Sequence, residues 1–447
     1  MVRREILRQG AFHSRLKQSP PPEPNQMQPF PWQEQAVEVM AESLSSGRSF
    51  LNASDTGTGK TPTALWAIKK TGLPFRVVCP KSVVHSWKEL ASEIGIADRM
   101  HWVSNIEKLR RNKDVLVPLG TNFLWKRSSE KIITVFDEVH RFSAYNSQNA
   151  VILSRCPRPA LMLSATAADS PVKLRAIGQH LGLCSWDEWP QWAAKRGCSL
   201  APMGGYQFSG HKSEIDRLHQ EIFDSGRGFR VRIADLGDQF PENSIETIGV
   251  EVEEGAEKAI NKAYVEEIEQ LKGEAPSPAV DMLRARQLAE HAKLPALLQL
   301  VEDEIEGGRS AVVFVNFRES LAQLVEKFDC PAIYGQQDTE ERETMVRSFE
   351  EDEKFVIGVM IQAGGCGLDG LQDLHGGRPR SSFICPGWSA IDLRQALGRI
   401  HRGNAKSRSL QKLVFAAGTI EDSVRRKLNG KLRRIDLLND GDLAFTQ

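Results

Sequence analysis

A glycine-rich segment is the first candidate for chemistry in this sequence. It reads, in order, Gly57, Thr58, Gly59, Lys60 and Thr61. The apolar run 49–53 precedes it and a helix-like stretch at 62–70 follows, which is the setting of a phosphate-binding loop. We expect Lys60 to contact the β- and γ-phosphates of a nucleotide and Thr61 to hold Mg²⁺. Ser54 stands where the full pattern has glycine. A glycine-rich turn that only caps a helix is the alternative interpretation.

Two adjacent carboxylates, Asp137 and Glu138, form the second candidate. They follow the apolar run 132–136, and side chains at the carboxyl end of a parallel strand face the ligand crevice. We expect Asp137 to bind Mg²⁺, directly or through water, and Glu138 to orient or deprotonate an attacking water. His140 either senses the γ-phosphate or connects to the next motif. A strand that ends in a solvated charged loop is the alternative, and the phosphate loop upstream weighs against it.

Short apolar runs that alternate with helix-length segments must position these residues. Five runs precede residue 170, at 49–53, 75–79, 115–117, 132–136 and 160–163. Five more follow, at 311–315, 332–334, 355–360, 382–385 and 412–415. This alternation predicts βαβ units and parallel sheets, and the two sets predict two α/β lobes.

The expected domain boundaries follow from composition. Residues 1–29 are a basic, proline-rich tail, and 30–235 form the first lobe with a helical, Trp-rich insertion at about 184–228. Residues 236–290 are an acidic linker with helices, and 291–447 form the second lobe with a basic C-terminal helix. Trp186, Trp189 and Trp192 of the insertion either pack in a core or form a stacking platform for bases.

Composition excludes several classes of protein. The 447 residues carry 58 Lys and Arg against 58 Asp and Glu, so the chain is not a globally basic nucleic-acid binder. Charge is nevertheless segregated, because positions 394–434 hold twelve Lys or Arg and two acids. No apolar run reaches the roughly 20 residues of a membrane span. The seven cysteines include no CxxC pair, which favours a reducing compartment.

The motifs taken together, in order, resemble those of a helicase superfamily 2 DExH-box motor of the Swi/Snf type. The resemblance covers about residues 30 to 430. The matching segments are 31–33, 53–61, 78–89, 137–140, 163–166, 229–232, 312–317, 334–349, 362–369, 395–402 and 419–421. It departs from the family pattern at Val139, at Ala167 and at 169–171, where an Asn-containing loop is usual.

This resemblance implies two tandem RecA-like domains with an ATP site in the cleft between them. Gln33 would read adenine, Gly367 and Asp369 would contact the nucleotide, and Arg399 and Arg402 would reach the γ-phosphate. Hydrolysis would be coupled to lobe movement by His140, Ser164, Ala165, Thr166 and Gln395. Nucleic-acid phosphates would be contacted by Lys81, Ser82, Thr166, Gly364 and Gly365. For Arg394 we expect a phosphate-backbone contact or a solvated helix position.

The expected function is that of an ATP-driven translocase on duplex or branched DNA, bound independently of sequence, with ATP and Mg²⁺ as cofactors. A DExH RNA helicase is one alternative, and Trp87 with Glu89 and the Gly364–Gly365 pair argue against it. A non-hydrolysing nucleotide-dependent clamp or scaffold is the other, and the intact Lys60, Glu138 and Arg402 argue against it. We also expect a monomer, possible recruitment by a partner protein, and a cytoplasmic, nucleoid-associated location in a bacterial or phage-infected cell.

Overall fold

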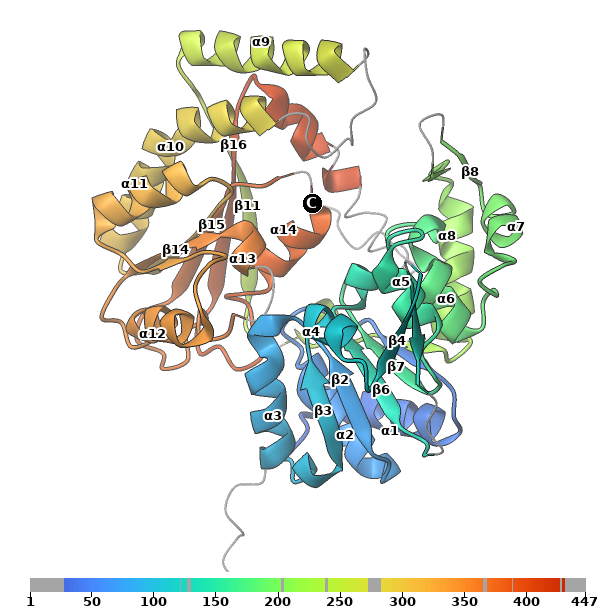
Figure 1. Ribbon diagram of the computed structural model, residues 1–447. Coiled ribbons are helices and arrows are strands. Elements are labelled where there is room, and N and C mark those ends of the chain that lie inside the picture. The colour runs from blue at the N-terminus through green and yellow to red at the C-terminus, as the bar shows by residue number, and fades with distance from the viewer. Residues whose placement is uncertain are drawn as a thin grey trace, which may run out of the picture.

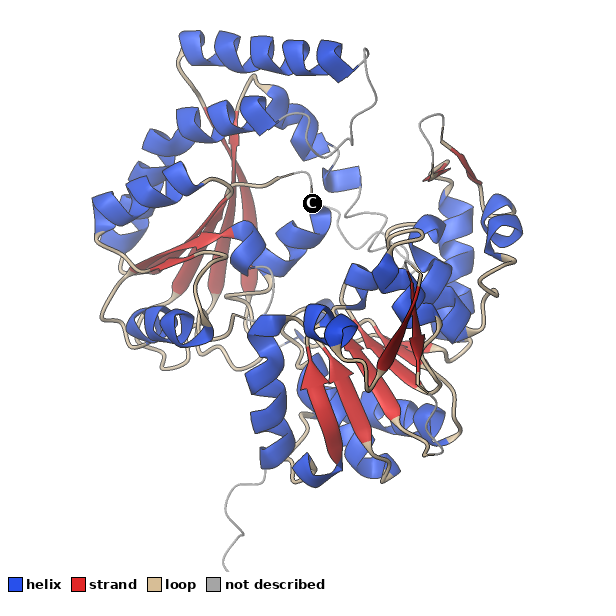
Figure 2. Ribbon diagram, in the orientation of Figure 1, coloured by secondary structure: helices blue, strands red, loops and turns tan. Residues whose placement is uncertain are grey.

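Two α/β lobes make up the described part of the molecule, a computed structural model (Figure 1, Figure 2). The structure describes residues 28–120, 122–126, 130–201, 205–237, 240–271, 283–364, 368–387, 389–426 and 428–430. Each lobe contains a six-stranded sheet in which all strand pairs are parallel. The predicted fold class, two tandem RecA-like domains, is confirmed. Gly365, Gly367, the tail 1–27 and the end of the basic C-terminal helix lie outside the described residues.

The first sheet has the strand order β10–β1–β7–β6–β2–β3. Its strands are β1 (Phe50–Asn52), β2 (Phe75–Val78), β3 (Met100–Ser104), β6 (Ile133–Asp137), β7 (Ala160–Leu163) and β10 (Gly228–Phe229). Successive side chains alternate between the two faces. One face packs against α1 (Pro31–Ser45), α2 (Lys60–Thr71) and α3 (Val84–Glu93). The other packs against α4 (Ile106–Arg111), α5 (Gln148–Ser154) and α6 (Arg175–Leu181).

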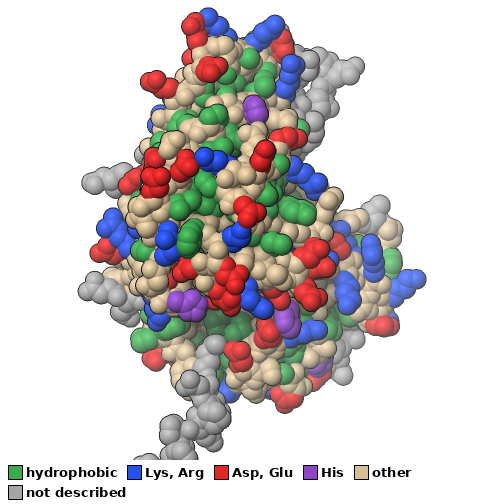
Figure 3. All heavy atoms as spheres, turned by 90° about the vertical axis from the view of Figure 1, so that its left-hand side faces the viewer, with side chains coloured by type: hydrophobic (Ala, Val, Ile, Leu, Met, Phe, Trp, Pro, Cys, Tyr) green, Lys and Arg blue, Asp and Glu red, His purple; other side chains and the backbone are tan. Residues whose placement is uncertain are grey.

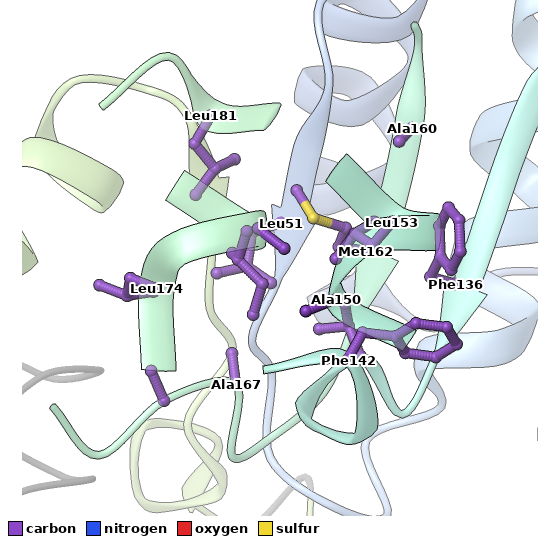
Figure 4. Close-up of a cluster of buried hydrophobic side chains, with 14 of the residues drawn as sticks. Leu51, Phe136, Phe142, Ala150, Leu153, Ala160, Met162, Ala167, Leu174 and Leu181 are labelled. Carbon is purple, nitrogen blue, oxygen red and sulfur yellow. The ribbon is translucent and has the colours of Figure 1, made fainter. Parts of the chain in front are cut away.

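The hydrophobic core between the first sheet and helices α4, α5 and α6 adjoins the predicted carboxylate site. Phe136 and Phe142 stack edge to face with ring centroids 5.1 Å apart, and both are buried. Figure 4 shows them beside Ala150 and Met162, which come from α5 and β7. Phe136 immediately precedes Asp137. Because packed aromatic side chains resist displacement, this core holds the end of β6 in place.

The second sheet has the order β11–β16–β15–β12–β14–β13. Its strands are β11 (Asn243–Val250), β12 (Ser310–Val315), β13 (Ala332–Ile333), β14 (Val356–Met360), β15 (Arg380–Ile384) and β16 (Ser409–Ala416). Helices α10 (Leu283–Glu306) and α11 (Arg318–Phe328) cover one face. Helices α12 (Thr339–Glu350) and α14 (Ala390–Leu397) cover the other. The short α13 (Ile361–Gly364) follows β14 at the cleft.

Some elements differ from the sequence expectation. The run at 115–117 belongs to β4 (Leu116–Leu119), which pairs antiparallel with β5 (Asn122–Trp125) in a separate hairpin and not in the parallel sheet. Strand β11 lies inside the segment 236–290, for which we expected a linker and helices, and pairs with β16 over all eight of its residues. Helices α9 (Glu254–Leu271) and α10 follow it and pack on each other. The second lobe therefore begins structurally at β11.

The Trp-rich insertion contains α7 (Trp189–Ala194), α8 (Lys212–His219) and a hairpin of β8 (Cys198–Leu200) and β9 (Tyr206–Phe208). Trp189 and Trp192 are buried in the core of the first lobe. The Arg175 guanidinium lies over the Trp186 ring, 3.9 Å from its centroid. The three tryptophans therefore serve packing in this structure.

Candidate functional site

A cleft of about 1010 Å³ separates the two lobes. The first lobe lines it with Gln33, Gly59 and Lys81, among others, and the second with Asp369 and Arg402. The cleft lies at the carboxyl ends of β1 and β6, where parallel sheets place their ligand sites. The predicted motifs of both lobes therefore meet at one site.

The phosphate loop connects β1 to α2, and Lys60 is the first residue of that helix. Gly59 adopts a left-handed conformation with φ of 84°, which glycine adopts without strain. The Lys60 ammonium donates hydrogen bonds to the carbonyl oxygens of Ser54 and Asp55, both at 3.1 Å. Burial lowers the pKa of Lys60. The negative charges of Glu138 and Asp137 act in the opposite direction and only partly offset this effect. Thr61 follows in the first turn of α2, whose free amides attract an anion.

Gln33 is tied to this loop. Its side-chain amide donates to the carbonyl oxygen of Thr58 at 3.0 Å, and its Oε1 accepts the N–H of Phe30 at 2.9 Å. A Cβ added to Gly59 would lie 2.4 Å from Nε2 of Gln33. The lack of a side chain at Gly59 thus allows the glutamine element to touch the phosphate loop.

Asp137 and Glu138 lie at the end of β6, half-buried beside Lys60. Burial and the adjacent Glu138 charge raise the pKa of Asp137 to about 6, although the Trp87 indole N–H donates to its Oδ2 at 3.0 Å. Burial alone would raise the pKa of Glu138 as well. The hydrogen bond from His140 and the charges of Lys60 and Arg399 instead hold it below its ordinary value. Glu138 is thus kept ionised at neutral pH, while the pKa of its neighbour Asp137 is about 6.

His140 connects the carboxylate motif to the next one. Its Nδ1 lies 3.2 Å from Oε2 of Glu138 and 3.0 Å from the Ser164 hydroxyl, which follows β7. Ser164, Ala165 and Thr166 are all buried, and the Thr166 N–H donates to the Ser164 hydroxyl at 3.2 Å. Glu138 itself has positive φ and ψ, 51° and 52°, a strained conformation for a non-glycine residue. Such strain is typical of functional positions.

Arg399 and Arg402 enter from the second lobe, directly after α14. Both donate to the carbonyl oxygen of Leu368, at 2.9 and 3.1 Å, and Arg402 pairs with Asp369 at 2.8 Å. The lobes touch closely here. A Cβ added to Gly57 would lie 2.7 Å from the carbonyl oxygen of His401, and one added to Gly398 would lie 2.3 Å from the Thr56 side chain.

Only some of the residues expected to contact nucleic acid lie at the cleft surface. Lys81 is exposed and Ser82 half-buried, and both line the cleft. Gly364 ends α13. Thr166 is buried, so this structure does not present its side chain to a ligand. Gln395 is also buried, inside α14.

Sequence reasoning missed two contributors. Trp87 was noted only as part of a motif, yet its buried indole contacts the predicted magnesium ligand Asp137. Arg230 donates to Oδ1 of Asp55 at 2.9 Å and thereby braces the phosphate loop. Arg230, like Trp87, was noted only as part of a matching segment. Neither contact is visible in the sequence, because the partners are 50 and 175 residues away.

Replacing Trp87 by Phe should shift the pH dependence of ATP turnover. Asp137 must be ionised to hold a cation, so kcat/KM should fall as the pH drops through about 6. The lost hydrogen bond stabilised the charged form. The acid limb of the variant should therefore move to higher pH by about one unit. A profile of kcat/KM between pH 5 and 8 measures this. Trp102→Phe, on β3, is the matched control, and equal shifts in both variants would contradict the assignment.

Two family models match the chain, one on each lobe. The type III restriction enzyme res subunit matches residues 26–169, and the helicase conserved C-terminal domain matches residues 292–404. A protein of Acanthamoeba polyphaga mimivirus that carries the name of an ATP-dependent RNA helicase is 28% identical over 465 residues, covering 93% of this chain and 84% of that one. The SWI2/SNF2 ATPase core of Sulfolobus solfataricus, solved in complex with dsDNA, aligns with a TM-score of 0.41 and 14% identity over 94% of each chain.

The matched segments contain most of the site residues described above. The first includes the phosphate loop and the Asp137–Glu138 pair, and the second includes Asp369, Arg399 and Arg402. Together they cover more than half of the chain, one match on each RecA-like lobe. The chain therefore belongs to the superfamily 2 helicases, and it is an ATP-dependent enzyme of that family.

Proposed function

We propose that this enzyme is a motor of the Swi/Snf type that uses ATP to move along or remodel duplex or branched DNA. One observation carries the motor part of the proposal. The phosphate loop and carboxylates of the first lobe face two arginines of the second lobe, and the lobes touch at Gly57 and Gly398. Neither lobe holds a complete catalytic set, so hydrolysis depends on how the lobes are placed. That dependence is what converts hydrolysis into movement.

Each residue has a distinct part in the proposed reaction. Lys60 neutralises the β- and γ-phosphate oxygens, and the amides at the start of α2 bind the same anion. Glu138, kept ionised by His140, takes a proton from the attacking water. Arg399 and Arg402 balance the charge that develops on the transferred phosphoryl group. When inorganic phosphate leaves after hydrolysis, its charge leaves the cleft with it, the attraction between the lobes falls and the cleft can open.

We further propose that Thr61 and Asp137 hold Mg²⁺ when the nucleotide is bound. The donor set fits, because a hydroxyl and a carboxylate are hard oxygen ligands, and Mg²⁺ typically uses one or two carboxylates together with phosphates. Burial raises the pKa of Asp137, and so does repulsion from the adjacent Glu138 carboxylate. A divalent cation relieves this repulsion. Bound there, it supplies charge neutralisation on the phosphate oxygens.

Nucleic acid is proposed to lie along the cleft edges, where Lys81 and Ser82 from η1 (Lys81–Val83) and the end of α13 are positioned to meet phosphates. Such contacts bind without regard to sequence and weaken with salt. On the face drawn in Figure 3, the visible acidic and basic side chains of the described residues are interspersed. That face offers no continuous basic area to a polyanion. Across the described parts of the chain, no helix is apolar and long enough to cross a bilayer.

An RNA helicase is the second candidate, and the name of the mimivirus relative favours it. Trp87 in its Swi/Snf-like position, hydrogen-bonded to Asp137, favours the DNA motor. A non-hydrolysing clamp is disfavoured because Lys60, Glu138 and Arg402 are all present, although a clamp would not need them for hydrolysis. The three lie close enough together for the charges of Glu138 and Arg402 to act on the pKa of Lys60.

Steady-state ATPase activity tests these candidates. It is measured without polymer and with single-stranded DNA, duplex DNA, a four-way junction, and RNA. Strong stimulation by duplex or junction DNA is the expected result. Stimulation by RNA alone would establish the RNA helicase in its place. No hydrolysis under any condition would contradict the motor and leave the clamp.

A further inference from the structure

The phosphate loop carries a carboxylate, Asp55, that meets arginines from both lobes. Within the first lobe, Oδ1 accepts from Arg230 at 2.9 Å and Oδ2 accepts the N–H of Ile233 at 2.9 Å. From the second lobe, Nη1 of Arg394 lies 3.8 Å from Oδ1. Asp55 stands two residues before Gly57 and five before Lys60. It is therefore placed to link the loop that binds phosphate to the lobe that completes catalysis.

Asp55 is held firmly on its own side of the cleft. The backbone after β10 extends the strand pairing onto the phosphate loop, with the Asp55 N–H donating to the carbonyl of Val231 at 3.0 Å. The Val231 N–H donates to the Ser54 hydroxyl at 3.0 Å, and Arg230 also donates to the carbonyl of Ala53 at 2.7 Å. With its loop fixed in this way, the carboxylate presents a fixed charge to the second lobe.

Arg394 sits in the last turn of α14, and its side chain is only 11% exposed. A solvated or backbone-binding arginine would be more accessible than this. Helix α14 leads directly into Gly398, Arg399 and Arg402. Thr56 and Gly57, which directly follow Asp55, come close to Gly398 and His401 of the second lobe. The Asp55–Arg394 pair therefore lies on the surface where the two lobes meet.

We propose that Asp55 and Arg394 are positioning residues, whose ion pair fixes helix α14 against the phosphate loop so that Arg399 and Arg402 reach the γ-phosphate. Arg394 then acts through the arginines that follow it and makes no contact with the reacting atoms. Burial alone would raise the pKa of Asp55, but Arg230 and Arg394 hold it below its ordinary value, so the carboxylate is charged at neutral pH. This role of Arg394 rests on the proposed part of Arg399 and Arg402 in ATP hydrolysis, and it is the same whichever nucleic acid the motor uses.

Kinetic parameters of Arg394→Gln provide the test. With the ion pair lost, the arginines of the second lobe are less often in place. We expect kcat to fall by about tenfold, the size of a coupling between contacting charged residues. The KM for ATP, and the dissociation constant of a fluorescent ADP analogue, should change by less than about threefold, because the first lobe binds the nucleotide. Arg394→Lys keeps the positive charge and should retain most of the wild-type kcat. Such a result would show that the loss in Arg394→Gln comes from the missing charge and not from a folding defect.

A double-mutant cycle identifies the partner. In the Asp55→Asn background, Arg394→Gln should cause no further loss of kcat, because its partner is already neutral. In the Arg230→Gln background it should still cause its full tenfold loss, since Arg230 acts within the first lobe. Arg230→Gln alone should instead raise KM by loosening the phosphate loop. Arg408→Gln, exposed on the second lobe, is the matched surface control.

Three outcomes would overturn the proposal. The first is an unchanged kcat in Arg394→Gln. The second is an equal loss of kcat in the wild-type and Asp55→Asn backgrounds. The third is an effect confined to the nucleic-acid concentration needed for half-maximal stimulation and to its salt dependence, which would make Arg394 a phosphate-backbone contact.

Discussion

Glu138→Gln is expected to lower kcat by about 10²- to 10⁴-fold while ATP binding is retained. The amide has the same shape as the carboxylate but cannot accept a proton from water. The backbone at this position has positive φ, and glutamine meets the same steric cost there as glutamate. The variant should therefore fold normally. Single-turnover hydrolysis and equilibrium binding of an ADP analogue measure the two effects separately.

Glu107→Gln provides the control for this change. Glu107 lies in the first turn of α4 and is exposed, so its kcat should stay within about twofold of wild type. If Glu138→Gln kept substantial hydrolysis, Glu138 would not be the base, and the strained geometry around it would need another explanation.

Arg402→Gln is expected to lower kcat by about 10³- to 10⁵-fold, the range for an arginine that stabilises phosphoryl transfer. In this structure Arg402 and Lys60 are close enough that the charge of Arg402 helps to lower the pKa of Lys60. In the proposed reaction the γ-phosphate binds both cations, and Arg402 stabilises the charge of the transferred phosphoryl group in the transition state. Rapid-quench measurement of the chemical step at saturating ATP tests this expectation.

The opposing result would be a variant with an unchanged chemical step and a raised KM. Arg402 would then serve binding only, and Arg399 would be left as the sole arginine for the phosphoryl group. Arg425→Gln is a suitable control, because Arg425 is half exposed and pairs with Asp422 on the surface of the same lobe.

The local part of this site could be predicted from sequence. Lys60 and Thr61 are identified by a strand, a glycine-rich turn and a helix, all within about 20 neighbouring positions of the chain. Asp137 and Glu138 are identified by the apolar run before them. In each case the backbone that positions the side chain is adjacent to it, so the pattern alone indicates where the side chain points.

The remaining features depend on contacts between distant segments. Strand β10 has only two residues, and it forms because β1 offers it a partner. Strand β11 was hidden in an acidic segment because it lies at a sheet edge, where its side chains remain largely accessible and polar residues are tolerated. Arg394 was expected to face solvent or nucleic acid, and its proximity to Asp55 follows only from how the lobes meet. Sequence periodicity carries no information about any of these contacts.

The short linker between the two lobes has a thermodynamic consequence. Strand β10 ends at Phe229 in the first sheet and β11 begins at Asn243 in the second, so residues 230–242 tether the two. A tether of this length gives each lobe an effective concentration of roughly millimolar at the surface of the other. The lobes can then attract each other weakly and still meet whenever ATP bridges them. The interface therefore need not be strong enough to hold the lobes together between cycles, because the covalent connection does that.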